Sequence, residues 1–439
     1  MVKALKQKFL GLDEHTLEVA RKSAASMVVK AGGLVVGMLV SIYLGRTLGS
    51  EGLGIVELSI RIASIMLVFT MFGMPNVLIK NIAIANSNQD YQKVSDNLHT
   101  ALLFNGGLAF VLAVLIYLLS PLICLSWLDL PLLLIPLKIA SIAVIPQTFS
   151  RIFASALNGL KKVWQSNLVN ESLSYWTVAL LLLILHYSDY GVDVVKIAWI
   201  FAISRIVVLL CIYLYWRGYF KLKQKGQWNL KSMIGPALPL LLVSGTSLIA
   251  SNADAVMLGW LGSASDVGMY TVAARLATLM IFFLVVTNSA ISPKLAAMYA
   301  SSDLQGMQLM VQRVTKLLVL IALVFMVCFV LIGEFVLGFW GAEFREAYWV
   351  LLILGAGQFV NISTGCAGML LVMCGYEKIH GYISLGSVCL NLVLNYFCIT
   401  RWGYIGAGVA TMITLIIENL FKMLSAKKVT GIHTLPTIL

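Results

Sequence analysis

Stretches of about 20 mostly apolar residues recur along the whole chain and constrain its fold more than any other feature. A helix of that length can cross a hydrocarbon core of about 30 Å. Only 11% of the 439 residues are charged, whereas soluble domains carry about 25%. The sequence therefore predicts an all-α polytopic membrane protein with twelve transmembrane helices, at residues 24–45, 53–73, 98–120, 132–156, 166–186, 194–216, 233–252, 267–291, 315–334, 347–373, 379–400 and 403–423.

The distribution of Lys and Arg between these spans predicts the orientation. Connections on the side of the N-terminus are basic, as at Lys161 and Lys162, while the opposite side holds little more than Arg46, Lys196, Arg345 and Arg401. Because Lys and Arg favour the cytoplasmic side, both termini are predicted to be cytoplasmic. The net charge of +12 then reflects topology, since the basic residues sit in short loops between spans. No nucleic-acid partner is expected.

Two similarities at nearly the same offset indicate an internal repeat. Residues 44–63 read LGRTLGSEGLGIVELSIRIA and residues 258–277 read LGWLGSASDVGMYTVAARLA, so that Arg275 follows Arg61 by 214 positions. LNGLKKV at 157–163 resembles MCGYEKI at 373–379, 216 positions later. We therefore expect two pseudo-symmetric six-helix bundles, an N-terminal lobe at 1–216 and a C-terminal lobe at 233–439, joined by a basic cytoplasmic linker at 217–232.

The loops and cysteines argue against chemistry outside the membrane. No connection is long enough to fold as a domain, so the functional site is expected among the helices. The seven cysteines form no CxxC and lie mostly within predicted spans. They are interpreted as small apolar side chains, and neither a metal site nor a cofactor is expected.

Basic residues inside the spans are the main site candidates. A charge near the middle of a bilayer costs roughly 2.5–3.5 kcal/mol, so such residues usually face a water-filled cavity or a partner. Arg275 has no acidic residue at i−4, so its partner must come from another helix or a ligand. Lys30 and Arg151 are close enough to span ends for their charges to reach water. The proposed cavity cations are Lys30, Arg61, Arg151, Arg205 and Arg275.

Acidic residues in or beside the spans are fewer, and three are candidates for ion coupling. Glu57 precedes Arg61 by four residues, so the two share a helix face and can form a structural ion pair or serve a cavity. Glu171 falls within the fifth span, and Asp254 comes just after the seventh. We expect one of Glu57, Glu171 and Asp254 to couple transport to a proton or sodium gradient.

The first copy of the repeat, here named the opening motif, resembles part of a known family. LGRTLGSEGLGIVELSIRIASI, followed by FGMPNVLIKNIA, is similar to the start of Wzx-type polysaccharide flippases. These belong to the multidrug/oligosaccharidyl-lipid/polysaccharide (MOP) exporter superfamily. The resemblance is clearest over residues 24–85 and extends over the chain as twelve spans in two halves. Related lipid II flippases usually have fourteen spans, and two more are not found here.

The resemblance implies a non-enzymatic flippase in a bacterial inner membrane, with a V shape that alternates between inward-open and outward-open states. Its cargo would be an undecaprenyl-diphosphate-linked oligosaccharide, such as an O-antigen unit, moved from the cytoplasmic to the periplasmic leaflet. Membrane lipids, a polysaccharide polymerase and a chain-length regulator would be its partners. The motif match assigns Arg61 to the cationic cavity, and the internal repeat extends this assignment to Arg275.

Two other functions compete with this interpretation. A drug/cation antiporter of the multidrug and toxic compound extrusion (MATE) branch shares the fold. Its organic cations require buried carboxylates, however, whereas the charges within these spans are mainly basic. A membrane-bound polymerase or ligase would need a sizeable outward loop for its catalytic residues, and the sequence predicts only short ones.

Overall fold

The described residues are helical almost throughout. The computed structural model describes residues 14–187, 191–219 and 226–435, and it contains no β-strand in these ranges. In chain order the helices are α2 (Glu14–Met71), α3 (Met74–Ser87), α4 (Tyr91–Pro121), η1 (Leu122–Trp127), η2 (Pro131–Leu133), α5 (Leu134–Gly159), α6 (Val163–Asn167), η3 (Leu168–Ser172), α7 (Leu173–Tyr187), α8 (Val194–Tyr219), α9 (Lys231–Leu261), α10 (Ala264–Ala300), α11 (Leu304–Leu337), η4 (Ala342–Ala347), α12 (Tyr348–Ser363), α13 (Ala367–Met373) and α14 (Glu377–Thr430).

The predicted fold class is confirmed, since the described chain is an all-helical bundle with many helices able to cross a membrane. Within the described ranges, seven helices qualify by themselves, and three bent helix pairs raise the number to ten. The 58 residues of α2 would span about 87 Å if straight, far more than one membrane crossing. Both α2 and α14 contain a non-helical glycine, Gly49 and Gly403, where two helices meet. Each of these two helices covers two predicted spans; the total of twelve remains a prediction.

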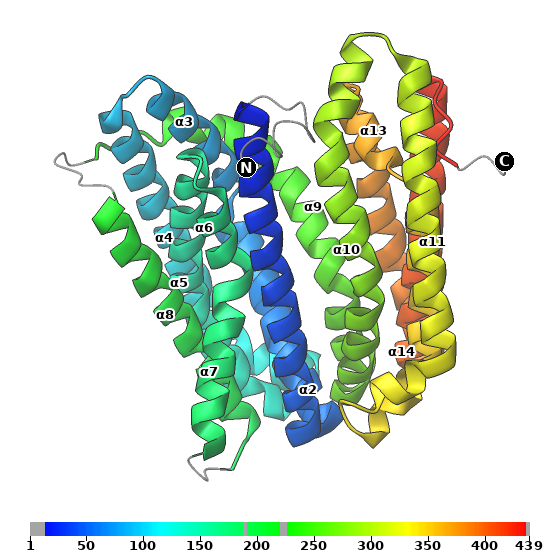
Figure 1. Cartoon of the computed structure of the whole chain (residues 1–439). Coiled ribbons are helices and arrows are strands. Elements are labelled where there is room, and N and C mark those ends of the chain that lie inside the picture. Colours follow the sequence, from blue (N-terminus) through cyan, green and yellow to red (C-terminus); the bar gives the residue numbers. More distant parts are fainter. Residues whose placement is uncertain (1–13, 188–190, 220–225, 436–439) are drawn as a thin grey trace, which may run out of the picture.

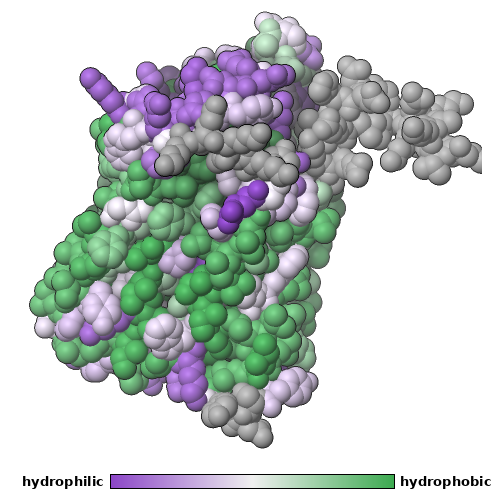
Figure 2. All heavy atoms as spheres, turned by 90° about the vertical axis from the view of Figure 1, so that its left-hand side faces the viewer, coloured by the Kyte–Doolittle hydropathy of each residue, from purple (hydrophilic) through white to green (hydrophobic). Residues whose placement is uncertain are grey.

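The molecule has two distinct ends. The beginning of α2 and the end of α14 lie at the upper end in Figure 1, here named the terminal end, and the lower end, where α2 and α14 bend, is named the kink end. Figure 2 shows hydrophilic residues gathered at the terminal end and a broad hydrophobic belt below them. Large apolar side chains on α4 and α8 are exposed on this half of the molecule, and α11 in the other half also exposes large apolar side chains. A surface of that kind suits lipid rather than water.

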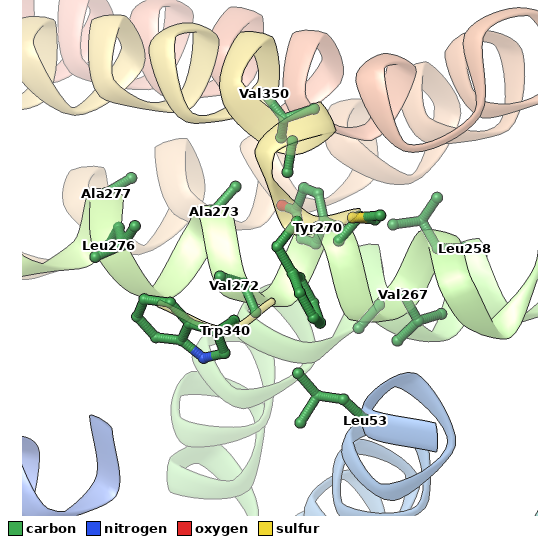
Figure 3. Packing of buried hydrophobic residues seen from close by; sticks show 14 of the residues in the cluster. Leu53, Leu258, Val267, Tyr270, Val272, Ala273, Leu276, Ala277, Trp340 and Val350 are labelled. Carbon is green, nitrogen blue, oxygen red and sulfur yellow. The ribbon is translucent and has the colours of Figure 1, made fainter. Parts of the chain in front are cut away.

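Buried apolar residues form one core shared by both halves, one further core in each half, and a small cluster of Ile139, Ala198 and Ala202 in the first half. The shared core joins residues 40–58 of α2 to residues 255–284 of α9 and α10 and to Ile399 and Ala407 beside the bend in α14. It therefore lies toward the kink end, and Figure 3 shows Leu53, Val267, Tyr270 and Trp340 together within it.

Toward the terminal end the cores are separate. The first-half core combines residues between Ala63 and Trp216 with Met233 and Ala237 of α9. The second-half core lies between Leu295 and Ile432. The two halves are thus packed together at the kink end, while at the terminal end their cores are separate and the start of α9 packs on the first half.

The helix α9 belongs to both halves. Its first segment, 231–241, contributes to the first-half core, and its second segment, 244–261, contributes to the shared core. The two segments meet at a bend of 46°. The helix also runs past residue 252, where the predicted seventh span ended, so Asp254 lies within a helix. The charge of Asp254 ended the apolar pattern in the sequence, whereas in the structure its carboxylate is satisfied by hydrogen bonds.

Candidate functional site

The two copies of the repeated motif contact each other at the kink end. A Cβ on Gly54 of α2 would lie 1.7 Å from the carbonyl oxygen of Ala264, and one on Gly268 of α10 would lie 2.1 Å from the carbonyl oxygen of Ser50. Both distances are far below van der Waals contact. Glycine at both positions therefore lets the α2 and α10 backbones cross, and the repeat is visible as a paired helix crossing.

The rest of the first motif binds the loop between α11 and α12. Arg46 donates from Nε to the carbonyl oxygen of Phe339 at 2.7 Å. The backbone N–H and the hydroxyl of Ser50 donate to the two carboxylate oxygens of Glu343, at 2.8 and 2.9 Å. Fully buried Trp340 donates from its indole to the hydroxyl of Ser41 at 2.9 Å. This set of contacts, named the kink-end latch, joins the two halves of the chain.

Deeper in the bundle, the two repeated arginines share one carboxylate. Glu57 accepts from Nη2 of Arg275 at 2.6 Å, and Nε of Arg61 lies 3.8 Å from its other oxygen. Arg275 also donates to the carbonyl oxygen of Gly37 at 3.1 Å. The partner that Arg275 required is thus a carboxylate on another helix, and the i, i+4 pair within α2 is the longer of the two contacts.

This cluster of Arg61, Glu57 and Arg275 retains an excess positive charge and spare donors. Two guanidinium groups face a single carboxylate, which leaves a formal charge of +1. Nη1 of Arg61 makes only long contacts, 3.2 Å to the carbonyl oxygen of Ser251 and 3.4 Å to Asn252, and its buried Nε has no hydrogen-bond partner. The Arg61 side chain is 28% exposed and that of Arg275 20%. The cluster can therefore still bind an anion.

A second polar cluster lies around Asp254, between α9, α10 and the two segments of α14 on either side of its bend. One oxygen of Asp254 accepts from Asn395 at 2.6 Å, and the other accepts from Tyr270 at 2.5 Å and Thr411 at 2.8 Å. Asn395 also donates to Asn391 at 3.0 Å, and the buried Oδ1 of Asn395 has no partner. Carboxylate, hydroxyl and amide oxygens together make a site that could hold a proton or a hard cation.

The remaining candidates lie apart from these clusters. Lys30 in α2 and Arg151 in α5 are partly buried, and each interacts with a neighbour. Arg205 lies in α8 and lines a pocket inside the first half. Glu171 belongs to η3, and its side chain is outside the described residues. Among the residues that are described, no group of three or more His, Cys, Asp or Glu side chains could hold a metal ion.

Several residues of these clusters could not be found from the sequence. Glu343 and Trp340 reach α2 from nearly 300 positions away, and no local pattern marks them. Tyr270 looked like an ordinary apolar position of a span. Asn391 and Asn395 did carry a signal, because two amides one helical turn apart share a face.

Comparison with protein families gives two matches. The family described as "Polysaccharide biosynthesis protein" matches residues 19–299, well over half of the chain, and the family described as MatE matches residues 239–397. The first match includes the opening motif and both residues of the repeated arginine pair.

Curated relatives and solved structures agree with these matches. A probable flippase, AglR of Haloferax volcanii, is 23% identical over 96% of this chain and 86% of its own length. Agl15 of the same organism, a probable low-salt glycan biosynthesis flippase, is 25% identical over 38% of this chain, and the match spans only 35% of its length.

Among solved structures, an inward-facing multidrug resistance MATE family transporter of the MOP superfamily aligns with a TM-score of 0.77, at 15% identity over 93% of this chain and 97% of its own. The lipid II flippase MurJ in an inward closed conformation aligns with a TM-score of 0.72, at 16% identity over 93% and 87%. These structures share the fold with the present chain.

Proposed function

The chain belongs to the polysaccharide biosynthesis protein family, and on this premise we propose that it is a flippase for an undecaprenyl-diphosphate-linked oligosaccharide. The cargo would be an O-antigen unit or a similar surface polysaccharide repeat, carried from the cytoplasmic to the periplasmic leaflet. The relatives named as probable flippases and the transporter fold support a transport protein rather than an enzyme. The lipid-linked form of the cargo follows from the resemblance to Wzx-type flippases.

The observation that carries the proposal is the excess positive charge of the cluster formed by Arg61, Glu57 and Arg275. A diphosphate cannot cross hydrocarbon without counter-charge. Guanidinium groups bind phosphate oxygens through two parallel hydrogen bonds, and Arg61 has donors that the protein does not use fully. Glu57 would hold the two arginines in place while leaving a net charge for the cargo. Lys30 and Arg151 would add positive charge along the path.

The arrangement of the cores supports alternating access. The halves share a core and a latch at the kink end, and their interiors are separate at the terminal end. This is the packing expected of a state that is closed toward the kink end. For the cargo to leave there, the contacts of Ser50 with Glu343 and of Gly54 with Ala264 would have to separate.

The apolar helices and the basic connections between them determine how we place the protein in a membrane. The protein is a multi-pass membrane protein by its apolar helices and transporter fold. We assign it to a bacterial inner membrane with the terminal end in the cytoplasm, because the basic connections lie on that side. A polysaccharide polymerase and a chain-length regulator would act on the cargo after its release.

Asp254 is the strongest candidate for ion coupling. Glu57 is already engaged by two guanidinium groups, so its oxygens are less available to a coupling ion. Asp254 instead faces hydroxyl and amide groups, with an unused oxygen on Asn395. Either a proton on Asp254 or a sodium ion between these oxygens would change the contacts that join α9, α10 and α14.

One further function has specific support. The MatE match covers residues 239–397, the part of the chain that contains the partly buried Asp254, and a carboxylate within the spans is what a cation-coupled multidrug antiporter requires. In this alternative the net positive charge of the arginine cluster would repel an organic cation, so we rank it second.

Reconstituted protein tests both functions at once. In proteoliposomes, the wild-type protein should move a fluorescent undecaprenyl-diphosphate oligosaccharide between leaflets and should leave an organic cation dye undisturbed. An imposed proton or sodium gradient should accelerate transport, and Asp254→Asn should lose that acceleration. Movement of the dye without the lipid-linked sugar would favour the antiporter. Transport that ignores both gradients would remove the coupling proposal while leaving the flippase intact.

A further inference from the structure

A pocket inside the first half contains an arginine that the arginine cluster between the halves does not involve. Its walls come from the part of α2 after its bend, from α5 and from α8, and the empty space between them is about 460 Å³ when the solvent-open volume at its mouth is counted. Five alanines line it, which explains why the helices leave a hollow there. The polar groups in its wall are Arg205, Gln147, Ser59 and Ser64.

These polar groups are incompletely satisfied. Arg205 is partly buried in α8, and among the described residues it has no ion pair or hydrogen bond. Gln147 is only 9% exposed and also lacks a partner among them. No acidic side chain lines the pocket. A partly buried guanidinium without a counter-charge is unfavourable within a membrane, so an anion is the expected occupant.

The two serines restrict the chemistry of that anion. The hydroxyl of Ser59 donates to the carbonyl oxygen of Val56 at 2.7 Å, and that of Ser64 donates to the carbonyl oxygen of Ile60 at 2.8 Å. Their hydrogens are therefore committed, and their oxygens can only accept. A ligand that suits the pocket would offer anionic oxygens to Arg205 and Gln147 and a hydroxyl group to the serines.

We propose that the pocket between α2, α5 and α8 is a binding site for a phosphate oxyanion that also carries a hydroxyl group. Two sources have this chemistry, the headgroup of a phospholipid such as phosphatidylglycerol and free inorganic phosphate. The site is distinct from the cluster of Arg61, Glu57 and Arg275, because all its walls belong to the first half, whereas that cluster also involves α9 and α10. Both sites share α2, so an occupant of the pocket would also contact the helix that carries Arg61.

Thermal unfolding of the purified full-length chain in a non-ionic detergent tests the proposal. One arm adds inorganic phosphate against chloride at equal ionic strength, and the other adds short-chain phosphatidylglycerol against diacylglycerol, which lacks the phosphate. The midpoint of wild-type unfolding should rise with at least one phosphate probe. In Arg205→Gln the apparent affinity for that probe should fall by about tenfold or more, since a charge-assisted contact is lost.

Two further variants make the result specific. Arg217→Gln removes an exposed arginine from the same helix and should respond as the wild type does. Ala202→Leu fills the pocket while keeping Arg205, so it should also abolish the response. This variant tests the site even if Arg205→Gln does not fold. A response to both probes supports the site with free phosphate as a ligand, and a response to the lipid alone supports it with the headgroup as the source. The proposal is overturned if the wild type does not respond to either phosphate probe. It is also overturned if Arg205→Gln and Ala202→Leu respond as strongly as the wild type.

Discussion

At the scale of single residues, Glu57 contacts both Arg61 and Arg275, which the repeat places far apart in the sequence. Its carboxylate contacts Arg275 at 2.6 Å and Arg61 at 3.8 Å, and its side chain is 8% exposed. A carboxylate between two guanidinium groups relieves their mutual repulsion and fixes their positions. It does so without cancelling the charge that a diphosphate would need.

Replacing Glu57 by Gln should therefore be costly. The change leaves two partly buried guanidinium groups without a counter-charge, and we expect the free energy of unfolding to fall by about 3 kcal/mol. Arg61→Gln should cost less than about 1 kcal/mol, because its ion pair is long and more exposed. Chemical unfolding in detergent measures both values. Equal losses in the two variants would show that Glu57 does not serve both arginines.

The sequence predicted some of these residues but not which of them contact each other. The repeated stretches at 44–63 and 258–277, in which Arg275 follows Arg61 by 214 positions, identified the two arginines. The pairing of Glu57 with Arg275 depends on how α2 crosses α10, which no local pattern encodes. For the same reason the separation of Arg205 into its own pocket became visible only when α2, α5 and α8 were placed together.

At the scale of elements, the family motif acts as a contact surface. Its glycines and polar side chains meet α10 and the loop before α12, and they form the kink-end latch. Glycine at position 49 has φ 69°, a left-handed conformation that ends one arm of α2 and begins the next. The motif thus sets the bend, the crossing and the contact between halves within eleven residues, 44–54.

A methyl group at the helix crossing tests this role. Gly54→Ala would place a Cβ 1.7 Å from the Ala264 carbonyl oxygen, so α2 and α10 must move apart. We expect a loss of about 1–3 kcal/mol in stability and faster thiol labelling of Ser265→Cys, in a background without the seven native cysteines.

The control for this substitution lies on α4. A Cβ on Gly107 has nothing within 4 Å, and Gly107→Ala should be neutral or stabilising because alanine favours the helix. If Gly54→Ala behaved as Gly107→Ala does, the close crossing of α2 and α10 would be refuted.

Helix positions were predictable from apolar length, while helix ends were not. Every predicted span falls on helical segments, because hydrophobic stretches of that length have few alternatives. The stretches between predicted spans at 74–97 and 292–314 are mostly helical, as α3, the start of α4 and the extended ends of α10 and α11. Polar helical residues outside the apolar belt carry no hydropathy signal, so only the packed structure reveals them.

At the scale of the whole molecule, the two ends differ in how the halves are joined. A shared core and the latch close the kink end, whereas the cores at the terminal end are separate and the start of α9 packs on the first half. The arginine cluster lies between α2, α9 and α10, the helices through which the two halves meet. A cargo bound to Arg61 and Arg275 would therefore contact both halves at once, which is what allows binding to favour one packing over another.

The most direct test of the central claim is export by arginine variants in cells at matched protein levels. Arg61→Ala and Arg275→Ala should each reduce surface polysaccharide by about tenfold or more, because each removes a charge-assisted contact to phosphate. Arg217→Ala, on an exposed residue of α8, should export as the wild type does. Full export by both cluster variants would contradict the claim that these two guanidinium groups carry the phosphate of the cargo.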